Sequence, residues 1–215
     1  FSSCGIGVSN HIAPYGANRG LIDHCIIDNP YKNDLSIPGR YWAYGISPVG
    51  TFYNWETDLN KLAGKYDGLS NILYVEDCSF RRTRHSIAGT GGIYYVARHN
   101  YFTEMILSHY GSYLDAHGGS GTPPAVGTRG MELYDNLIED SPTDYRSTDQ
   151  QQYWGQYMGR AVGLRGGAGM IFNNDIRNCG SGINLYSDAN YDICRPHDIW
   201  IWNNNYDKGV VPVAN

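Results

Sequence analysis

The residues best suited to proton transfer lie in the middle of the chain. Asp115 and His117 are two positions apart, and such positions share a face in a β-strand. A carboxylate beside a histidine can tune the orientation and pKa of the imidazole for proton transfer. Tyr113 precedes Asp115 by two positions, so we expect its hydroxyl on the same face. Arg129 and Arg165 follow and could neutralise an anionic substrate group.

Two further histidines stand upstream of this pair. His85 directly follows Arg84, and His99 occurs later in the chain. If equivalent positions of successive coils stack, we expect Arg84, His85 and His99 to share a surface with Asp115 and to bind substrate. A transition-metal site made of His85, His99, Asp115 and His117 is an alternative, because imidazole and carboxylate suit Zn²⁺. No compact HxxxH spacing supports that alternative, so no metal ligand is assigned.

The elements that carry these residues are defined by a motif that recurs six times. It is an apolar residue, two free positions, an Asn or Cys, one free position and a large apolar residue. The Asn or Cys stands at Cys25, Cys78, Asn100, Asn136, Asn174 and Asn204. Most positions three and five residues earlier are apolar, which is the period of a strand with one buried face. A motif that returns at variable intervals is typical of a solenoid with inserted loops.

A second strand is expected in most coils, and glycine clusters close the coils. These strands are placed at 41–47, 86–89, 112–117, 161–165 and 182–187. The shortest interval between motifs, from Cys78 to Asn100, is 22 residues. Longer intervals require insertions, which we place at 48–68, 103–111, 120–128 and 141–159. No stretch shows a sustained helical period.

The ladder motif, as it stands at 75–80 and 171–176, resembles the right-handed parallel β-helix of the pectate-lyase-like superfamily. The resemblance covers about the whole chain, and we read 1–215 as one all-β domain of about six to seven stacked coils. The segment 113–118 is similar to the Asp-Pro-His motif of β-helix alginate epimerases and lyases, with Ala116 in place of the Pro. In that family the His and a nearby Tyr transfer protons.

These residues favour abstraction of a proton next to a carboxylate. In a uronic-acid polymer the C5 hydrogen is acidic once the carboxylate is neutralised. We cast His117 as the base, Tyr113 as the acid, and Arg129 or Arg165 as the neutralising group. The expected function is therefore a polysaccharide-engaging protein, a lyase or C5-epimerase of uronic-acid polymers.

Hydrolysis is the rival chemistry, and it needs two carboxylates about 5–9.5 Å apart. Asp115 and Glu132 are the plausible central pair. No cofactor is assigned with certainty. Ca²⁺ is the candidate, because it takes several oxygen ligands and Asp140, Asp144 and Asp149 could supply them. Solvated loops are the competing interpretation of these carboxylates.

Aromatic residues in two insertions could form the walls of a sugar groove. The insertion 141–159 contains Tyr153, Trp154 and Tyr157, which are expected to bind substrate together with Phe52, Tyr53 and Trp55. Flat amphipathic rings suit a wet groove. The competing interpretation is that these rings pin their own loops to the solenoid.

Charge and composition exclude several partners. The net charge is −5 with both signs interspersed, which gives no nucleic-acid footprint and disfavours anionic membranes. No apolar run approaches the roughly 20 residues that span a bilayer. The chain has five cysteines, and we expect Cys25 and Cys78 to be packing thiols, with a disulfide between them as the alternative.

A structural role is the rival function. Residues 1–8 match 176–183 position by position, so the chain begins inside a coil and we expect a longer protein with its own targeting segment. We expect an extracellular or cell-surface location. Uncapped solenoid ends could add strands from another chain, which favours self-association as a spike, adhesin or filament subunit.

Overall fold

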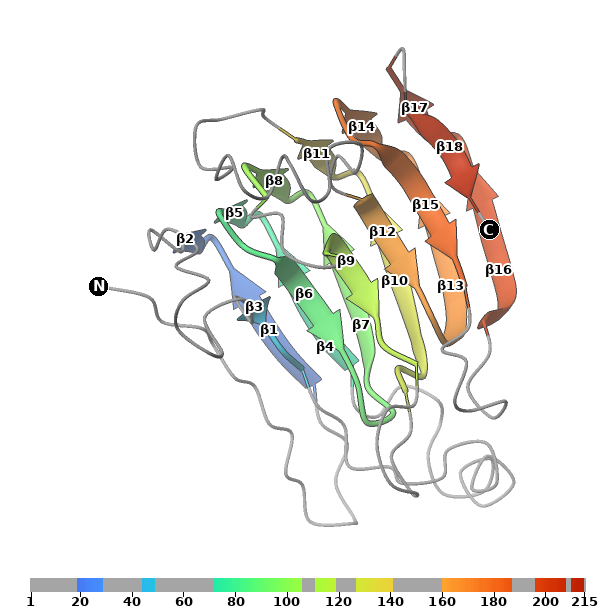
Figure 1. Ribbon diagram of the computed structural model, residues 1–215. Helices are drawn as coiled ribbons and strands as arrows, with labels where there is room; N and C mark the ends of the chain where they lie inside the picture. The colour runs from blue at the N-terminus through green and yellow to red at the C-terminus, as the bar shows by residue number, and fades with distance from the viewer. Residues whose placement is uncertain are drawn as a thin grey trace, which may run out of the picture.

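A computed structural model describes residues 19–28, 44–48, 72–105, 111–118, 127–140, 160–186, 196–207 and 210–214. Every regular element in these segments is a β-strand. The strands form three parallel sheets of six strands each, and the strands of every sheet follow one another along one direction (Figure 1). The predicted all-β class and the parallel solenoid are therefore confirmed.

Successive strands of the chain visit the three sheets in turn. The first sheet contains β1 (Arg19–Asp23), β4 (Ile72–Glu76), β7 (Tyr94–Arg98), β10 (Gly130–Tyr134), β13 (Gly167–Phe172) and β16 (Pro196–Trp202). The second contains β2 (Ile26–Asp28), β5 (Ser79–Arg81), β8 (Tyr101–Thr103), β11 (Leu137–Glu139), β14 (Asp175–Arg177) and β17 (Asn205–Tyr206). The third contains β3 (Tyr44–Ile46), β6 (His85–Gly89), β9 (Ser112–Ala116), β12 (Arg160–Leu164), β15 (Ser181–Leu185) and β18 (Val211–Ala214).

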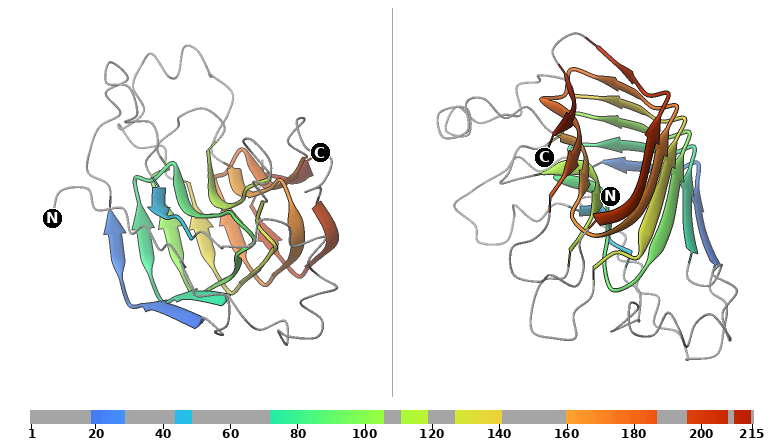
Figure 2. Two further views of the ribbon diagram at one scale, coloured as in Figure 1. Left: turned by 90° about the horizontal axis from the view of Figure 1, so that it is seen from below. Right: turned by 90° about the vertical axis from the view of Figure 1, so that its right-hand side faces the viewer.

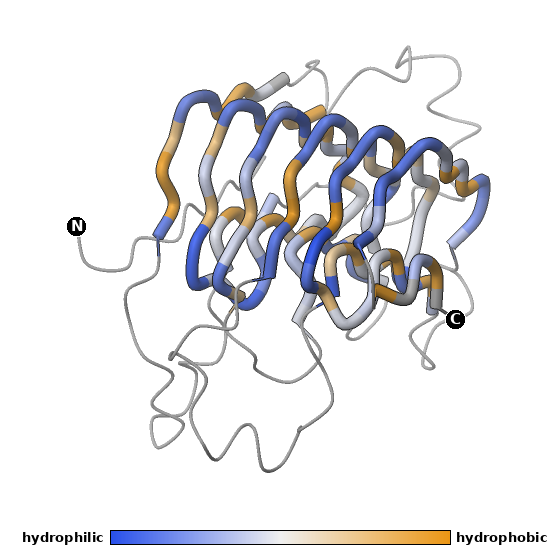
Figure 3. Tube along the Cα trace, turned by 90° about the horizontal axis from the view of Figure 1, so that it is seen from above, coloured by the Kyte–Doolittle hydropathy of each residue, from blue (hydrophilic) through white to orange (hydrophobic). Residues whose placement is uncertain are grey.

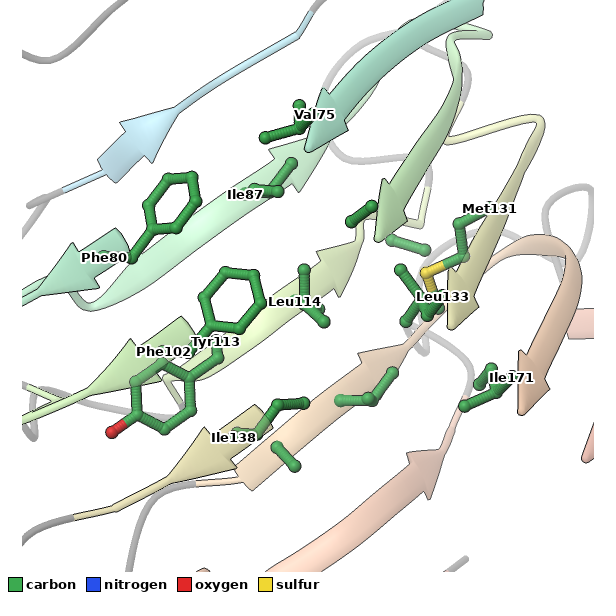
Figure 4. Close-up of a cluster of buried hydrophobic side chains, with 14 of the residues drawn as sticks. Val75, Phe80, Ile87, Phe102, Tyr113, Leu114, Met131, Leu133, Ile138 and Ile171 are labelled. Atoms are coloured by element: carbon green, nitrogen blue, oxygen red, sulfur yellow. The ribbon is translucent and has the colours of Figure 1, made fainter. Parts of the chain in front are cut away.

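The three sheets surround a common apolar interior (Figure 2). Apolar residues return at equivalent positions of successive coils along the chain trace (Figure 3). Val75, Phe80 and Ile87 come from three different sheets and are all fully buried (Figure 4). The parallel pairing aligns equivalent positions of successive coils, so Val75 pairs with Ala97 and Phe80 pairs with Phe102. This stacking makes the core continuous from coil to coil.

The Asn positions of the motif form a buried ladder between the first and second sheets. The Asn100 side-chain amide donates to Oδ1 of Asn136 at 3.1 Å, Asn136 donates to Asn174 at 2.9 Å, and Asn174 donates to Asn204 at 2.9 Å. Each of these amides also donates to a backbone carbonyl, as Asn136 does to Ala97 at 2.9 Å. The motif therefore satisfies backbone groups that a turn would otherwise bury without partners.

Cys25 and Cys78 continue this ladder toward the N-terminal end as free thiols. The Cys78 amide donates to Asn100 Oδ1 at 3.0 Å, and the Cys25 amide lies 3.4 Å from Cys78 Sγ. Burial raises the pKa of the Cys78 thiol to about 11. Both residues are thus packing thiols, as expected, and the disulfide alternative is not what the structure shows.

The residue before each ladder position has a left-handed backbone. The φ angles of these residues lie between 51° and 56°, at His24, Asp77, His99, Asp135, Asn173 and Asn203. Short polar side chains tolerate this conformation better than β-branched ones. His99 is one of these turn residues, which explains its place in the sequence without any role in binding.

Asp135 offers a test of this backbone requirement. Asp135→Val is expected to lower the free energy of unfolding by roughly 1–2 kcal/mol, because the left-handed region is strained for a β-branched residue. Asp135→Gly should be neutral or slightly stabilising. Urea unfolding of both variants checks the prediction, and equal stabilities of the Val and Gly variants would contradict it.

Candidate functional site

The third sheet departs from strict alternation, and this departure shapes its outer face. In β9 both Tyr113 and Leu114 belong to the core, and in β12 both Ala161 and Val162 do. The strand pairing runs through Arg160–Ser112 and Val162–Leu114, without a pair between them. Two successive inward residues leave Ser112 and Asp115 on the outside, where Ser112 Oγ donates to Asp115 Oδ1 at 3.3 Å.

The prediction that Tyr113 shares the face of Asp115 is wrong. Tyr113 is fully buried beside Phe102, with 6.1 Å between ring centroids (Figure 4). Its hydroxyl donates to Asp140 Oδ1 at 3.1 Å and accepts the Met105 amide at 2.9 Å. Burial, followed by the charge of Asp140, raises the Tyr113 pKa well above its ordinary value. Tyr113 is therefore a core residue and does not act as the acid at this face.

Asp115 points away from the apolar core, at the centre of the outer face of the third sheet. Its side chain is nevertheless completely shielded from solvent. Arg165 holds it with a fork, Nη2 to Oδ2 at 2.6 Å and Nε to Oδ1 at 3.3 Å. His117 Nε2 lies 2.7 Å from the same Oδ2. Burial opposes ionisation, but the interactions of the carboxylate with His85, His117 and Arg165 outweigh it and hold the Asp115 pKa well below its usual range. Asp115 and His117 lie together, as their spacing on a strand predicts, and Arg165 joins them from the end of β12.

His85 joins this group from the neighbouring strand β6. Its side chain is buried, and Nδ1 lies 2.9 Å from the Ser112 carbonyl oxygen. The ring meets the His117 ring edge-on at a centroid distance of 5.7 Å. Burial lowers the His85 pKa to about 4, although Asp115 acts in the opposite direction. His85 is therefore a neutral imidazole at physiological pH.

Tyr44 is the residue of this face that sequence reasoning missed. It pairs with His85 in the sheet, and their rings stack at 5.2 Å with an angle of 18°. The Tyr44 ring lies 6.2 Å from that of His117, and the Arg84 guanidinium lies over it at 6.0 Å. Burial raises the Tyr44 pKa, the nearby Arg84 lowers it, and Asp115 raises it again. We call His85, Asp115, His117, Arg165 and Tyr44 the Asp115 cluster.

Gly163 makes room for this cluster on strand β12. It pairs with Asp115, and a Cβ at Gly163 would lie 2.7 Å from Ser112 Oγ and 3.0 Å from Asp115 Oδ1. The position therefore requires a residue without a side chain if Ser112 and Asp115 keep their contact.

Gly163→Ala is expected to lower the free energy of unfolding by roughly 1–3 kcal/mol, the usual cost of overpacking a filled site. Calorimetric or urea unfolding measures the effect. A variant as stable as the wild type would show that a methyl group fits beside Ser112 and Asp115, which would contradict the short distances given above.

Other predicted site residues lie elsewhere. Arg129 directly precedes strand β10 of the first sheet, where its guanidinium lies over the Tyr94 ring at 5.5 Å, and burial lowers its pKa. Glu132 lies in β10 of the first sheet and accepts a hydrogen bond from the Tyr94 hydroxyl at 2.8 Å. Asp115 lies in the third sheet, so the two carboxylates do not form the expected hydrolytic pair on a shared face. His99 is exposed at a turn and meets Tyr134 edge-on at 6.3 Å. The expectation that His99 shares the surface of Asp115 is therefore wrong.

The predicted groove residues Tyr153, Trp154 and Tyr157 lie outside the described residues, as do Asp144 and Asp149. Asp140 is described and is buried against Tyr113 rather than placed in a solvated loop. In the part of the chain that the structure describes, no helix has the length and apolar character needed to cross a bilayer.

Comparison of the chain with protein-family models, with curated proteins and with solved structures finds no significant match. What the fold defines is a three-sheet parallel β-solenoid. On the outer face of the third sheet, a buried carboxylate lies among two imidazoles, a guanidinium and a phenol. The function therefore has to be argued from the cluster itself.

Proposed function

We propose that this chain is a right-handed β-helix protein of the pectate-lyase-like kind that engages acidic polysaccharide at the Asp115 cluster. The proposed reaction is removal of the C5 proton of a uronic-acid unit, as in a lyase or a C5-epimerase. The observation that carries the proposal is Asp115, a fully buried carboxylate that contacts His117 and Arg165 beside Tyr44. Polymers of this kind lie outside cells, so we propose an extracellular or cell-surface location.

The charge of the cluster suits an anionic substrate. Arg165 pairs with the single carboxylate of Asp115, and Arg84 adds a second guanidinium beside the cluster, over the Tyr44 ring, so guanidinium groups exceed carboxylates by one when the imidazoles are counted as neutral. A net positive charge close to a substrate carboxylate would neutralise it and so raise the acidity of the C5 hydrogen. Arg165 takes the neutralising role that the sequence offered to either Arg129 or Arg165.

Two groups can exchange the proton. His117 directs Nε2 at Asp115, which leaves Nδ1 to accept the C5 proton. Tyr44 replaces Tyr113 as the acid, because its raised pKa keeps the phenol protonated. After proton removal the electron pair passes toward the carboxylate. In elimination the C4–O bond breaks and the leaving oxygen takes the Tyr44 proton, whereas in epimerisation C5 regains a proton on its opposite face.

Substitution of these two groups tests the proposal. His117→Ala and Tyr44→Phe are each expected to lower turnover roughly 10²- to 10⁴-fold, the usual contribution of a positioned acid or base. The readouts are the ultraviolet absorbance of unsaturated sugar ends and the NMR spectrum of epimerised units, over a panel of uronic-acid polymers. His99→Asn, a surface histidine at a turn, is the matched control and should keep full activity.

If the wild type forms neither product from any polymer of the panel, the enzymatic proposal is overturned. The non-catalytic alternative, a spike, adhesin or filament subunit, would then be the better explanation of the fold. Binding of a polymer without turnover would retain the polysaccharide partner and remove the acid and base roles of Tyr44 and His117.

A further inference from the structure

Two imidazole nitrogens of the Asp115 cluster have no hydrogen-bond partner. His85 Nδ1 lies closer to the Ser112 carbonyl, at 2.9 Å, than to the Ser112 amide, at 3.3 Å, which favours a proton on Nδ1. Nε2 of His85 is then a lone-pair nitrogen, and it is buried without a partner. A buried acceptor of this kind is costly unless a ligand uses it.

His117 shows the same pattern from the other side. Its Nε2 lies 2.7 Å from Asp115 Oδ2, yet it has no aligned hydrogen-bond partner. A nitrogen and a carboxylate oxygen that lie this close without an aligned hydrogen bond resemble two ligand atoms of one cation. One ligand atom from each of His85, Asp115 and His117 lies within 4.8 Å of the others.

We propose that His85, Asp115 and His117 bind one divalent transition-metal ion through two imidazole nitrogens and a carboxylate oxygen. This ligand set suits Zn²⁺ and its neighbours, whose bonds to such atoms are about 2.0–2.2 Å long. Ligand atoms around such an ion are roughly 3–4 Å apart. Side-chain rotations therefore have to widen the 2.7 Å separation of His117 Nε2 and Asp115 Oδ2, within a set whose ligand atoms all lie within 4.8 Å of one another. Three protein ligands leave a further position for water or substrate, as in catalytic rather than structural zinc sites.

Two of the three ligands are held by hydrogen-bond partners of the kind that orient ligands in metal sites. The Ser112 carbonyl fixes the tautomer and ring orientation of His85, and Arg165 orients the Asp115 carboxylate. His117 keeps 19% of its side chain exposed, which provides an entry path for the ion. His85 and Asp115 lie on the adjacent strands β6 and β9, and His117 directly follows β9, so the sheet itself sets their spacing.

This inference goes beyond the proposed function, and it gives His117 a role as a ligand that excludes the base role proposed above. A bound ion uses the Nε2 lone pair of His117 and leaves its Nδ1 protonated, so His117 cannot then accept a substrate proton. With the ion bound, Tyr44 remains as the proton-transfer group of the cluster. Metal binding is measured without any polysaccharide, so failure of one proposal is distinguishable from failure of the other.

The test is titration of the chelator-treated full chain with Co²⁺, followed by visible spectroscopy, and with Zn²⁺, followed by calorimetry. We expect saturation at a single ion per chain. His85→Gln and His117→Gln should each weaken binding by roughly 100-fold or more, since loss of even an orienting partner costs 10- to 100-fold. Far-ultraviolet circular dichroism shows whether each variant is folded.

Asp77→Asn is the matched control, because among the described residues Asp23, His24 and Asp77 form the other group of nearby potential ligands, and they are exposed. This variant should bind the ion as the wild type does. The proposal is overturned if the wild type does not bind Co²⁺ or Zn²⁺ stoichiometrically. It is also overturned if binding survives both histidine substitutions, or if it is lost in Asp77→Asn instead.

Discussion

Replacement of Asp115 by Asn is expected to lower the free energy of unfolding by roughly 3–5 kcal/mol, the cost of breaking a buried ion pair from one side. Asn has nearly the same shape, so the loss comes from charge. The Arg165 guanidinium, only 16% exposed, would lose the carboxylate that compensates it. Urea unfolding followed by circular dichroism measures the change.

Asp175→Asn is the control for that substitution. Asp175 pairs with Arg177 on the surface, where both side chains are 30% or more exposed. Exposed pairs of this kind contribute about 0–1 kcal/mol, so this variant should unfold close to the wild type. If Asp115→Asn were no less stable than Asp175→Asn, Asp115 would not be the electrostatic centre of the outer face.

The second large effect is expected at the ladder. Asn136→Ala removes an amide whose Oδ1 accepts from the backbone and side chain of Asn100 and whose Nδ2 donates to Ala97 and Asn174. The substitution leaves several buried polar groups without partners, each at about 1–3 kcal/mol. We expect the free energy of unfolding to fall by roughly 3 kcal/mol or more.

Asn205→Ala is the control, because its amide donates to Asp175 on an exposed surface at 3.2 Å. Its effect should stay below about 1 kcal/mol, as for most surface substitutions. Similar losses in the two variants, measured by urea unfolding, would show that the ladder contributes no more than any surface amide.

The fold was predictable because its stabilising features recur. An Asn or Cys at a constant offset from buried apolar residues could be recognised six times, and each occurrence is in the same place in its coil. The second-strand ranges agree with β6, β9 and β12 to within one residue at each end, and with β15 to within two. Repetition turns a weak local pattern into a strong one.

The candidate site was predictable only in part. Asp115 and His117 are neighbours in sequence, and both face outward as expected. Tyr113 was misplaced because strict alternation was assumed, whereas Tyr113 and Leu114 both enter the core. Tyr44 was missed because its equivalence to His85 depends on register across a long insertion, which only the paired strands reveal.

The two arginine candidates could not be separated from sequence for a similar reason. Arg129 and Arg165 each stand next to a strand, at its start and at its end, respectively. Only the sheet to which each strand belongs decides that Arg165 meets Asp115 while Arg129 covers Tyr94. Function in a solenoid therefore depends on which coil face a residue occupies, and sequence spacing does not determine that face when loops vary in length.

Proton abstraction at the Asp115 cluster can be measured directly by NMR in heavy water. The C5 hydrogen signal of a uronic-acid polymer should disappear in the presence of the wild type, since elimination and epimerisation both remove that hydrogen. The loss should be slower in Tyr44→Phe and His117→Ala by roughly 10²-fold or more, and unchanged in His99→Asn. Persistence of the C5 signal with the wild type, over the whole panel of polymers, would contradict the proposed function.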